Sequence, residues 1–196
     1  MRLSIACLLG LAALLTAGCD RQKAAEPQGA GPDANAGATK AGTYPTGRLD
    51  RSLAGTPAPD VTFQDPEGQP ASFADFRGRP LLVNLWATWC APCVVEMPSL
   101  DRLAAREGDR LQVLALSQDL EGREKVEEFF EARSLGRLEP YLDETMAAMT
   151  ALRVSVLPTT ILYDSEGREV WRMTGMAEWD GERERRLIAE AEAGER

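Results

Sequence analysis

The chain has 196 residues, of which 44% are apolar and 27% charged, proportions typical of one globular domain. Acidic residues outnumber basic ones by 31 to 22, and the net charge of −9 disfavours a nucleic-acid partner, because phosphate backbones need a basic surface. The chain contains no histidine, which excludes Ser-His-Asp and Cys-His catalysis and any zinc or copper site ligated by histidine. Its chemistry must therefore come from carboxylates, hydroxyls, lysines or the four cysteines.

The N-terminus has the pattern of a bacterial lipoprotein signal peptide. Arg2 precedes an uncharged, mostly apolar stretch at residues 3–17. As a helix this stretch would span ~22 Å, less than the ~30 Å hydrocarbon core of a membrane, so we expect a secretory signal rather than a membrane span. Small residues follow and lead to Cys19, in a segment that resembles a lipobox, whose cysteine becomes the lipidated N-terminus. We therefore expect a signal peptide at 1–18, with an ordinary signal peptide and a chance cysteine as the alternative.

The number of cysteines supports lipidation of Cys19. Cys7 would leave with the signal peptide, and Cys90 and Cys93 can pair with each other. Cys19 would otherwise be an odd free thiol in an oxidising compartment. In related bacterial lipoproteins an Asp directly after the lipidated cysteine keeps the protein in the inner membrane, and Asp20 stands at that place. For a Gram-negative host this predicts a lipid anchor on the periplasmic side of the inner membrane.

A tether is expected to separate the anchor from the folded domain. The segment from Asp20 to Gly55 has 36 residues, of which 17 are Gly, Ala or Pro. Its apolar side chains are too few to offset the loss of chain entropy on folding, so we expect no fixed structure there. A flexible chain of this length reaches roughly 30–35 Å. The lipidated cysteine and tether would then occupy residues 19–55, and the folded domain residues 56–196.

Hydrophobic periodicity begins after residue 56 and alternates between strands and helices. In chain order we expect a hairpin at 61–63 and 71–73, a buried strand at 81–86, a helix after Cys93 bent at Pro98, a buried strand at 111–116, a helix at 125–135, a short strand at 141–142, a helix through 146–152, a second hairpin at 160–163 and 170–173, and a final helix at 180–193. This order indicates an α/β fold with a sheet of mixed direction.

The residues suited to chemistry are in the run Trp89-Cys90-Ala91-Pro92-Cys93, between a buried strand and a helix. A thiolate at a helix N-terminus faces unpaired N–H groups and the positive end of the helix dipole, which lower its pKa. We therefore assign Cys90 as the attacking thiolate and Cys93 as the buried resolving thiol. A metal site would need two further thiol or imidazole ligands, so we predict no metal and no cofactor. The other alternative, a purely structural disulfide, would close a loop too short to constrain the unfolded chain much.

The run from Asn84 to Cys93, with Glu96 and Pro98, resembles the membrane-anchored, TlpA-like branch of the thioredoxin superfamily, which has ResA and CcmG types. That branch includes thiol–disulfide oxidoreductases of cytochrome c maturation. The resemblance covers roughly residues 57–175, and an extra helix and strand of the family map onto residues 120–143. It implies a thioredoxin-like fold with a mixed central sheet flanked by helices, an N-terminal β-hairpin and a helix–strand insertion.

Client-binding roles follow from the same resemblance. Pro158 matches a cis-proline that faces the cysteine pair, and Leu157 would offer its backbone groups to an extended client peptide. A trans proline that opens the following strand is the alternative. Trp89 is expected at the rim of the site, where it would contact the client rather than take part in the chemistry. Val156 stands where relatives commonly have glycine, and its bulk would narrow the docking groove.

Glu96 lies about one helical turn after Cys93, and the family assigns this position a role in thiol ionisation and proton transfer. A half-buried carboxylate would have a raised pKa and could accept the Cys93 proton. The alternative is a solvated glutamate on the helix surface. Asn84 stands where ordinary thioredoxins have a buried Asp, so the usual base is missing, which favours Glu96. Asn84 could equally serve only to hydrogen-bond the neighbouring backbone.

Together these features predict a lipid-anchored thiol–disulfide oxidoreductase outside the cytoplasm. Its Cys90–Cys93 pair would exchange with cysteines or disulfides of client proteins, with a membrane thiol reductant as electron donor. The dipeptide Ala91-Pro92 has no cation to stabilise a thiolate strongly, so we expect a reducing couple. The alternatives are a copper-handling module, which usually needs histidine, a non-catalytic binding lipoprotein, and a peroxiredoxin-like thiol peroxidase, whose Pro-x-x-x-Thr-x-x-Cys arrangement is absent around Cys90.

Overall fold

The computed structural model describes residues 46–193. The predicted signal peptide, Cys19 and most of the predicted tether lie outside the described residues, so the structure does not test them. In the described part of the chain, no helix has the length and apolar character needed to cross a membrane.

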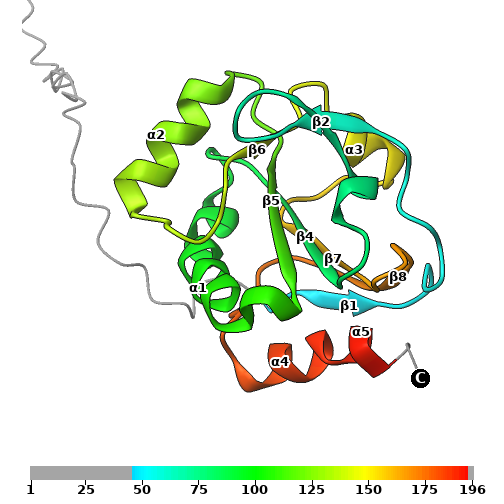
Figure 1. The fold of residues 1–196 in the computed structure, drawn as a ribbon. Coiled ribbons are helices and arrows are strands. Elements are labelled where there is room, and N and C mark those ends of the chain that lie inside the picture. The colour runs from blue at the N-terminus through cyan, green and yellow to red at the C-terminus, as the bar shows by residue number, and fades with distance from the viewer. Residues whose placement is uncertain (1–45, 194–196) are drawn as a thin grey trace, which may run out of the picture. The chain divides into compact units, whose positions relative to one another are not determined.

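One mixed sheet of eight strands organises the domain (Figure 1). The strand order across the sheet is β1-β8-β7-β4-β5-β6-β2-β3. Within it, β4 runs parallel to β5 and antiparallel to β7, so the predicted mixed direction is confirmed. The strands are β1 (Arg48–Asp50), β2 (Thr62–Gln64), β3 (Pro70–Ser72), β4 (Leu81–Trp86), β5 (Gln112–Ser117), β6 (Tyr141–Leu142), β7 (Thr159–Tyr163) and β8 (Glu169–Thr174).

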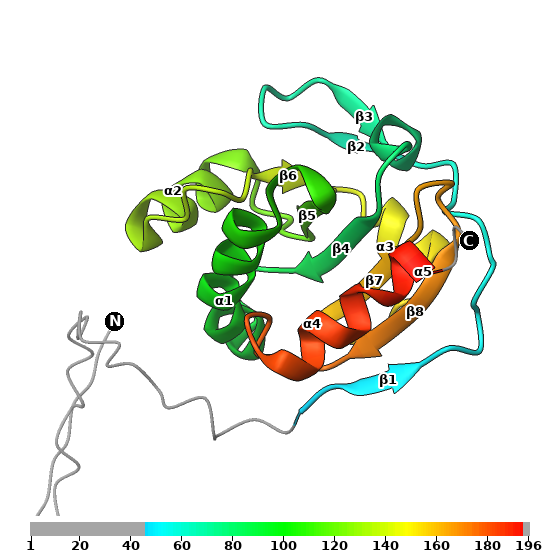
Figure 2. The same cartoon turned by 60° about the horizontal axis from the view of Figure 1, so that its bottom comes forward.

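Helices cover both faces of the sheet (Figure 2). They are α1 (Ala91–Glu107), α2 (Arg123–Arg133), α3 (Ala147–Ala151), α4 (Glu182–Ile188) and α5 (Glu190–Ala193), with short 3-10 turns η1 (Phe73–Phe76) and η2 (Gly108–Arg110). The predicted final helix is therefore divided at Ala189 into α4 and α5.

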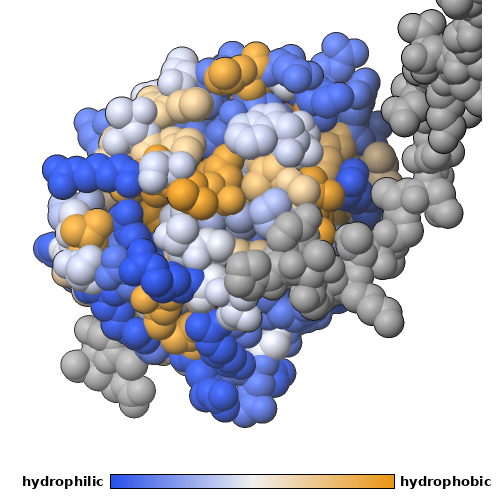
Figure 3. Space-filling view, turned by 180° about the vertical axis from the view of Figure 1, so that it is seen from behind, coloured by the Kyte–Doolittle hydropathy of each residue, from blue (hydrophilic) through white to orange (hydrophobic). Residues whose placement is uncertain are grey.

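The central strand β4 contributes to a core on each side of the sheet, because successive side chains point to opposite faces. Leu82 and Trp86 pack in the cluster that contains α1 and α2, whereas Leu81, Val83 and Leu85 pack in the cluster that contains α3. All six residues of β4 are buried, which explains why the strand is a nearly continuous apolar run. On the side of the molecule opposite to the view of Figure 1, hydrophobic surface forms a central band among hydrophilic residues (Figure 3).

Residues 48–50 were predicted to lie in a chain without fixed structure, and this prediction is wrong. These residues form β1, the edge strand, and pair antiparallel with β8. Leu49 packs against the core, and the N–H of Gly47 donates to the carbonyl of Met176 at 2.7 Å. A Cβ at Gly47 would lie 2.7 Å from the carbonyl oxygen of Gly175, so only glycine fits there. An edge strand gains backbone hydrogen bonds with little apolar burial, which is why the composition gave no signal.

Candidate active site

The two cysteines lie where β4 passes into α1. The N–H of Cys90 donates to the carbonyl of Ala87 at 3.1 Å in a tight turn, and Cys90 is then the N-cap of α1. Its own carbonyl accepts the first helical hydrogen bond, from Val94 at 3.0 Å, and Pro92 occupies the first helical turn. The predicted placement of the pair, after a buried strand and at the start of a helix, is confirmed.

Cys90 and Cys93 form a disulfide, with their Cα atoms 5.3 Å apart. The two sulfur-bearing residues differ in accessibility: Cys90 is 5% exposed and Cys93 is fully buried. Cys90 also lies at the positive end of the α1 dipole, where a thiolate is favoured after reduction. Of the two, Cys90 is therefore the one that retains some contact with solvent.

The turn before Cys90 is held by a buried carboxylate that the sequence analysis did not identify. Asp119, in the segment after β5, accepts a hydrogen bond from the backbone N–H of Thr88 at 2.9 Å and from its hydroxyl at 2.6 Å. The hydroxyl of Ser117 donates to the same carboxylate at 2.6 Å. These bonds tie the ends of two parallel strands together. No sequence pattern marks this residue, because the contact depends on the register of β4 and β5.

Glu96 is 2% exposed, so the alternative of a solvated helix glutamate is wrong. Its Oε1 accepts a hydrogen bond from the Asn84 amide at 2.7 Å, and its Oε2 accepts one from the backbone N–H of Ala177 at 2.9 Å. Burial raises the pKa of Glu96 to about 7, and the two hydrogen bonds act in the opposite direction. A carboxyl group with this pKa can exchange a proton at neutral pH. It lies on α1 one turn beyond Cys93, as the sequence spacing predicted.

Asn84 is fully buried in β4 and bonds to side chains, which excludes the interpretation that it serves only the neighbouring backbone. Besides Glu96, its amide N–H group donates to the hydroxyl of Thr160 in β7 at 2.9 Å. The antiparallel register places Thr160 directly opposite Asn84. No sequence pattern points to Thr160, because only the pairing of β4 with β7 brings it next to Asn84.

The peptide bond between Leu157 and Pro158 is cis, as the family resemblance implied, and the trans alternative is wrong. Pro158 immediately precedes β7, whose first residue Thr159 pairs with Leu85 of β4. This register places Pro158 at the end of the central strands, where β4 leads into the cysteine turn.

Three large hydrophobic side chains are exposed in the described part of the chain, and all three lie in loops at this end of the central strands. Trp89 follows β4 and is 67% exposed, Leu120 follows β5 and is 68% exposed, and Val156 precedes β7 and is 52% exposed. A groove of about 590 Å³ is lined by Trp89 and by residues of α2, among them Phe129 and the charged side chains of Lys125, Glu128 and Arg133. Trp89 and Val156 were predicted to lie near the site, whereas Leu120 was not. An exposed apolar surface around a reactive cysteine is suited to binding another protein.

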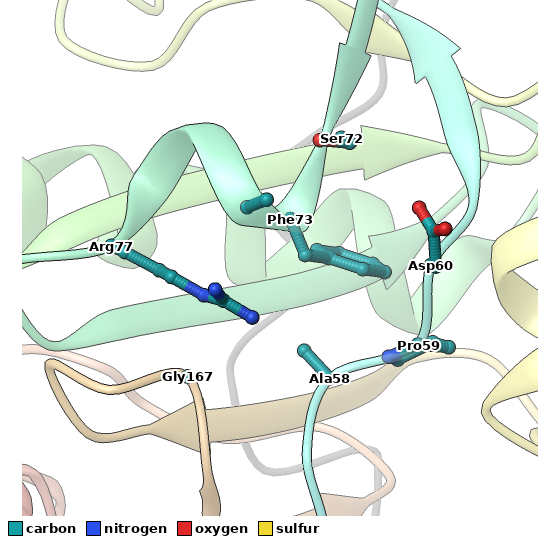
Figure 4. Close-up of a pocket in the computed structure, with 8 residues that line it drawn as sticks. Ala58, Pro59, Asp60, Ser72, Phe73, Arg77 and Gly167 are labelled. Atoms are coloured by element: carbon teal, nitrogen blue, oxygen red, sulfur yellow. The ribbon is translucent and has the colours of Figure 1, made fainter.

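A separate cavity of about 340 Å³ lies at the opposite end of β4 and β7 (Figure 4). Asp60 and Arg77 line it on two sides, and Phe73 lies between them. The turn between β7 and β8 closes this end, where the N–H of Gly78 donates to the carbonyl of Ser165 at 2.9 Å. The cavity contains no cysteine, so it is not the site of thiol chemistry. Within residues 46–193, no group of three or more Cys, Asp or Glu side chains could hold a metal ion.

Comparisons with known proteins agree with this geometry. The profile of the AhpC/TSA family matches residues 54–185. The thiol-disulfide oxidoreductase ResA of Geobacillus thermodenitrificans is 34% identical over 62% of the chain and 69% of its own length. The thioredoxin-like protein YneN of Bacillus subtilis is 33% identical over 58% of the chain and 66% of its own length. The crystal structure of the thioredoxin domain of a thiol-disulfide oxidoreductase from Bacteroides vulgatus superposes with a TM-score of 0.57 at 23% identity, covering 70% of this chain and 96% of that one.

Proposed function

Because the chain belongs to the AhpC/TSA family and is a thioredoxin-fold thiol–disulfide oxidoreductase similar to ResA, we propose that its Cys90–Cys93 pair reduces disulfides of client proteins outside the cytoplasm. The observation that carries this proposal is the unequal accessibility of two bonded cysteines at one helix N-terminus. That arrangement supports a role for Cys90 in bonding the client and a role for Cys93 in resolution.

The exchange proceeds in two steps, formation of a mixed disulfide and its resolution. In the reduced protein, the Cys90 thiolate attacks one sulfur of the client disulfide, so a mixed disulfide forms and the other client sulfur leaves as a thiolate. Glu96 then accepts the Cys93 proton, and the Cys93 thiolate attacks the Cys90 sulfur. The second client sulfur leaves as a thiolate, and the two client sulfurs take up one proton from Glu96 and one from solvent. Two electrons have passed to the client, and the Cys90–Cys93 disulfide has formed.

The client is held around Cys90, at the end of the central strands. Trp89, Leu157 and Pro158 form the binding surface expected from the family, and the exposed side chains of Leu120 and Val156 enlarge it. A client cysteine bonded to Cys90 would bring its chain neighbours to this end of the sheet. Apolar residues beside that cysteine are therefore favoured. A closely spaced cysteine pair, such as the Cys-x-x-Cys-His segment where c-type haem attaches, is the client class we propose, which assigns the protein to cytochrome c maturation.

The membrane part of the proposal rests on the sequence. Cys19 carries the lipid, Asp20 keeps the protein at the periplasmic face of the inner membrane, and a membrane thiol reductant restores the Cys90–Cys93 dithiol. The absence of a cation in Ala91-Pro92 supports the reducing direction.

A thiol peroxidase of the peroxiredoxin type is a second candidate, which the AhpC/TSA match favours. In that reaction the Cys90 thiolate would attack a peroxide oxygen, breaking the O–O bond and releasing the other oxygen as water or an alcohol. Cys93 would then attack the sulfur of the resulting sulfenic acid, forming the disulfide with release of a second water. The accessible apolar surface beside Cys90 favours a protein client instead.

The test uses a synthetic peptide with a Cys-x-x-Cys-His segment closed by its own disulfide. We expect the reduced protein to open this disulfide, the Cys93→Ser variant to accumulate a covalent adduct with the peptide, and the matched Cys90→Ser variant to form little adduct, all measured by mass spectrometry. Adduct formation through Cys93 in the Cys90→Ser variant, at an equal or higher rate, would contradict the assignment. A protein inert toward the peptide that consumes hydrogen peroxide would establish the peroxidase instead.

A further inference from the structure

The carboxyl group of Glu96 is held by a side chain with no ionisable group. Asn84 donates one amide hydrogen to Glu96 at 2.7 Å and the other to the hydroxyl of Thr160 at 2.9 Å. All three side chains belong to different elements, and Asn84 and Thr160 are fully buried. The amide is therefore fixed between α1 and β7 through its nitrogen alone.

The other end of the same amide has no partner. The Oδ1 atom of Asn84 is buried and accepts no hydrogen bond from the described residues. A half-turn of the amide would place Oδ1 where the nitrogen now lies, facing both Glu96 and Thr160. It could then accept a hydrogen bond from a protonated Glu96, and the Thr160 hydroxyl could rotate to donate to it. Both orientations make two hydrogen bonds. The half-turn therefore keeps their number and exchanges an unpaired carbonyl oxygen for an unpaired NH2 group.

We propose that Asn84 is a positioning residue that stays hydrogen-bonded to Glu96 in both protonation states, donating to the carboxylate and accepting from the carboxylic acid. The proposal rests on the proposed function, in which Glu96 accepts the Cys93 proton. A buried base must remain bonded before and after it takes up that proton, because an unpaired buried polar group is costly. A carboxylate at position 84 could not donate to an ionised Glu96, whereas an amide can serve both states.

The surroundings of Glu96 make the amide the main adjustable contact. Along α1, Cys93 stands one turn before Glu96, and in the disulfide form neither Cys93 nor Cys90 titrates. The segment after β8 contributes the Ala177 N–H and the Trp179 indole, and β4 and β7 contribute only neutral groups. The indole nitrogen of Trp179 lies near enough to lower the pKa of Glu96, but its geometry makes no hydrogen bond, so its effect is weaker than that of the Asn84 amide.

The first test replaces the amide with a group that cannot bond to Glu96. In Asn84→Ala, the carboxylate loses a donor, so its pKa should rise and the pH profile of peptide reduction should move to higher pH. A shift of one pH unit would lower turnover at pH 7 by about fivefold and leave it unchanged near pH 9. This recovery at high pH would not occur for a purely structural role, which predicts the same loss at every pH. Ser99→Ala is the matched control, because the Ser99 hydroxyl bonds only the backbone carbonyl of Glu96, at 2.8 Å, and the N–H of Trp179.

The second test uses Asn84→Asp, which keeps the size of the side chain if Asn84→Ala folds poorly. Two carboxyl groups in contact would share one proton, so the single transition near pH 7 should split into one below and one above it. An unsplit profile at the wild-type position would overturn the proposal.

Glu96→Gln separates this inference from the proposed function. If Glu96→Gln reduces the peptide at the wild-type rate from pH 5 to 9, Glu96 is not the base and the proposed proton transfer fails. If Glu96→Gln slows turnover while Asn84→Ala lowers the rate equally at every pH, only the role of Asn84 fails. In the Glu96→Gln background, Asn84→Ala should cause no further shift of the profile.

Discussion

The ionisation of Glu96 links the chemistry of the site to the stability of the fold. The pKa of Glu96 rises from 4.5 to about 7 on folding, because burial penalises its charged form. Below about pH 4.5, the carboxyl group is protonated in both the folded and the unfolded chain. As the pH rises toward 7, the unfolded chain releases this proton while the folded chain retains it, so the free energy of unfolding falls. The fall is complete above about pH 7 and amounts to roughly 3 kcal/mol for a shift of this size.

Glu96→Gln should therefore flatten the pH dependence of stability. Both proteins are compared in the oxidised form. Between pH 5 and 8, the free energy of unfolding of Glu96→Gln should fall by about 2–3 kcal/mol less than that of the wild type. Denaturant titrations at the two pH values measure this change. Glu131→Gln, on the exposed surface of α2, is the matched control and should leave the pH dependence unaltered. Parallel curves for Glu96→Gln and the wild type would show that the carboxyl group is ionised in both states.

Among the helices and strands, the ones that could be predicted are those whose own side chains show hydrophobic periodicity. The buried run of β4 and the helical spacing of α1 are local signals, and the two turns with Asp and Gly fix the hairpins, so their existence and order could be predicted. The edge strand β1 could not, because three residues with one large apolar side chain form no period. The contacts of Asn84 with Thr160, and of Asp119 with Thr88, depend on strand register, which no single segment encodes. The cysteine pair could therefore be predicted from the sequence, whereas the hydrogen bonds that surround it could not.

Leu49 tests whether β1 is a stable part of the domain. It pairs with Met173 and packs against the core, so Leu49→Ala should lower the free energy of unfolding by about 1–2 kcal/mol without changing peptide reduction. Arg48→Ala, on the exposed side of the same strand, should leave the stability nearly unchanged. Both are measured by denaturant unfolding. Equal stability of Leu49→Ala and the wild type would mean that β1 contributes little to the fold.

At the scale of the whole molecule, the proposed anchor decides where the oxidoreductase works. The small residues before Cys19 and the short apolar stretch ahead of them are the features on which lipidation depends. Cys19→Ser should either release a soluble protein or block processing, and its mass should lack the lipid. Membrane fractionation and mass spectrometry measure both effects, with Cys7→Ser as the control that should leave them unaltered. Wild-type fractionation and mass of Cys19→Ser would refute the lipoprotein part of the proposal.

The position of β1 also has a mechanical consequence. A pull on the chain ahead of residue 46, such as a membrane attachment would exert, enters the domain through this strand. β1 lies at the edge of the sheet, and β8 and β7 separate it from β4, which carries the cysteine turn. Such a force would peel off a ladder of three residues before it loaded β4. With the proposed anchor, tension at the N-terminus would therefore reach the cysteine turn only after the pairing of β1 with β8 had been broken.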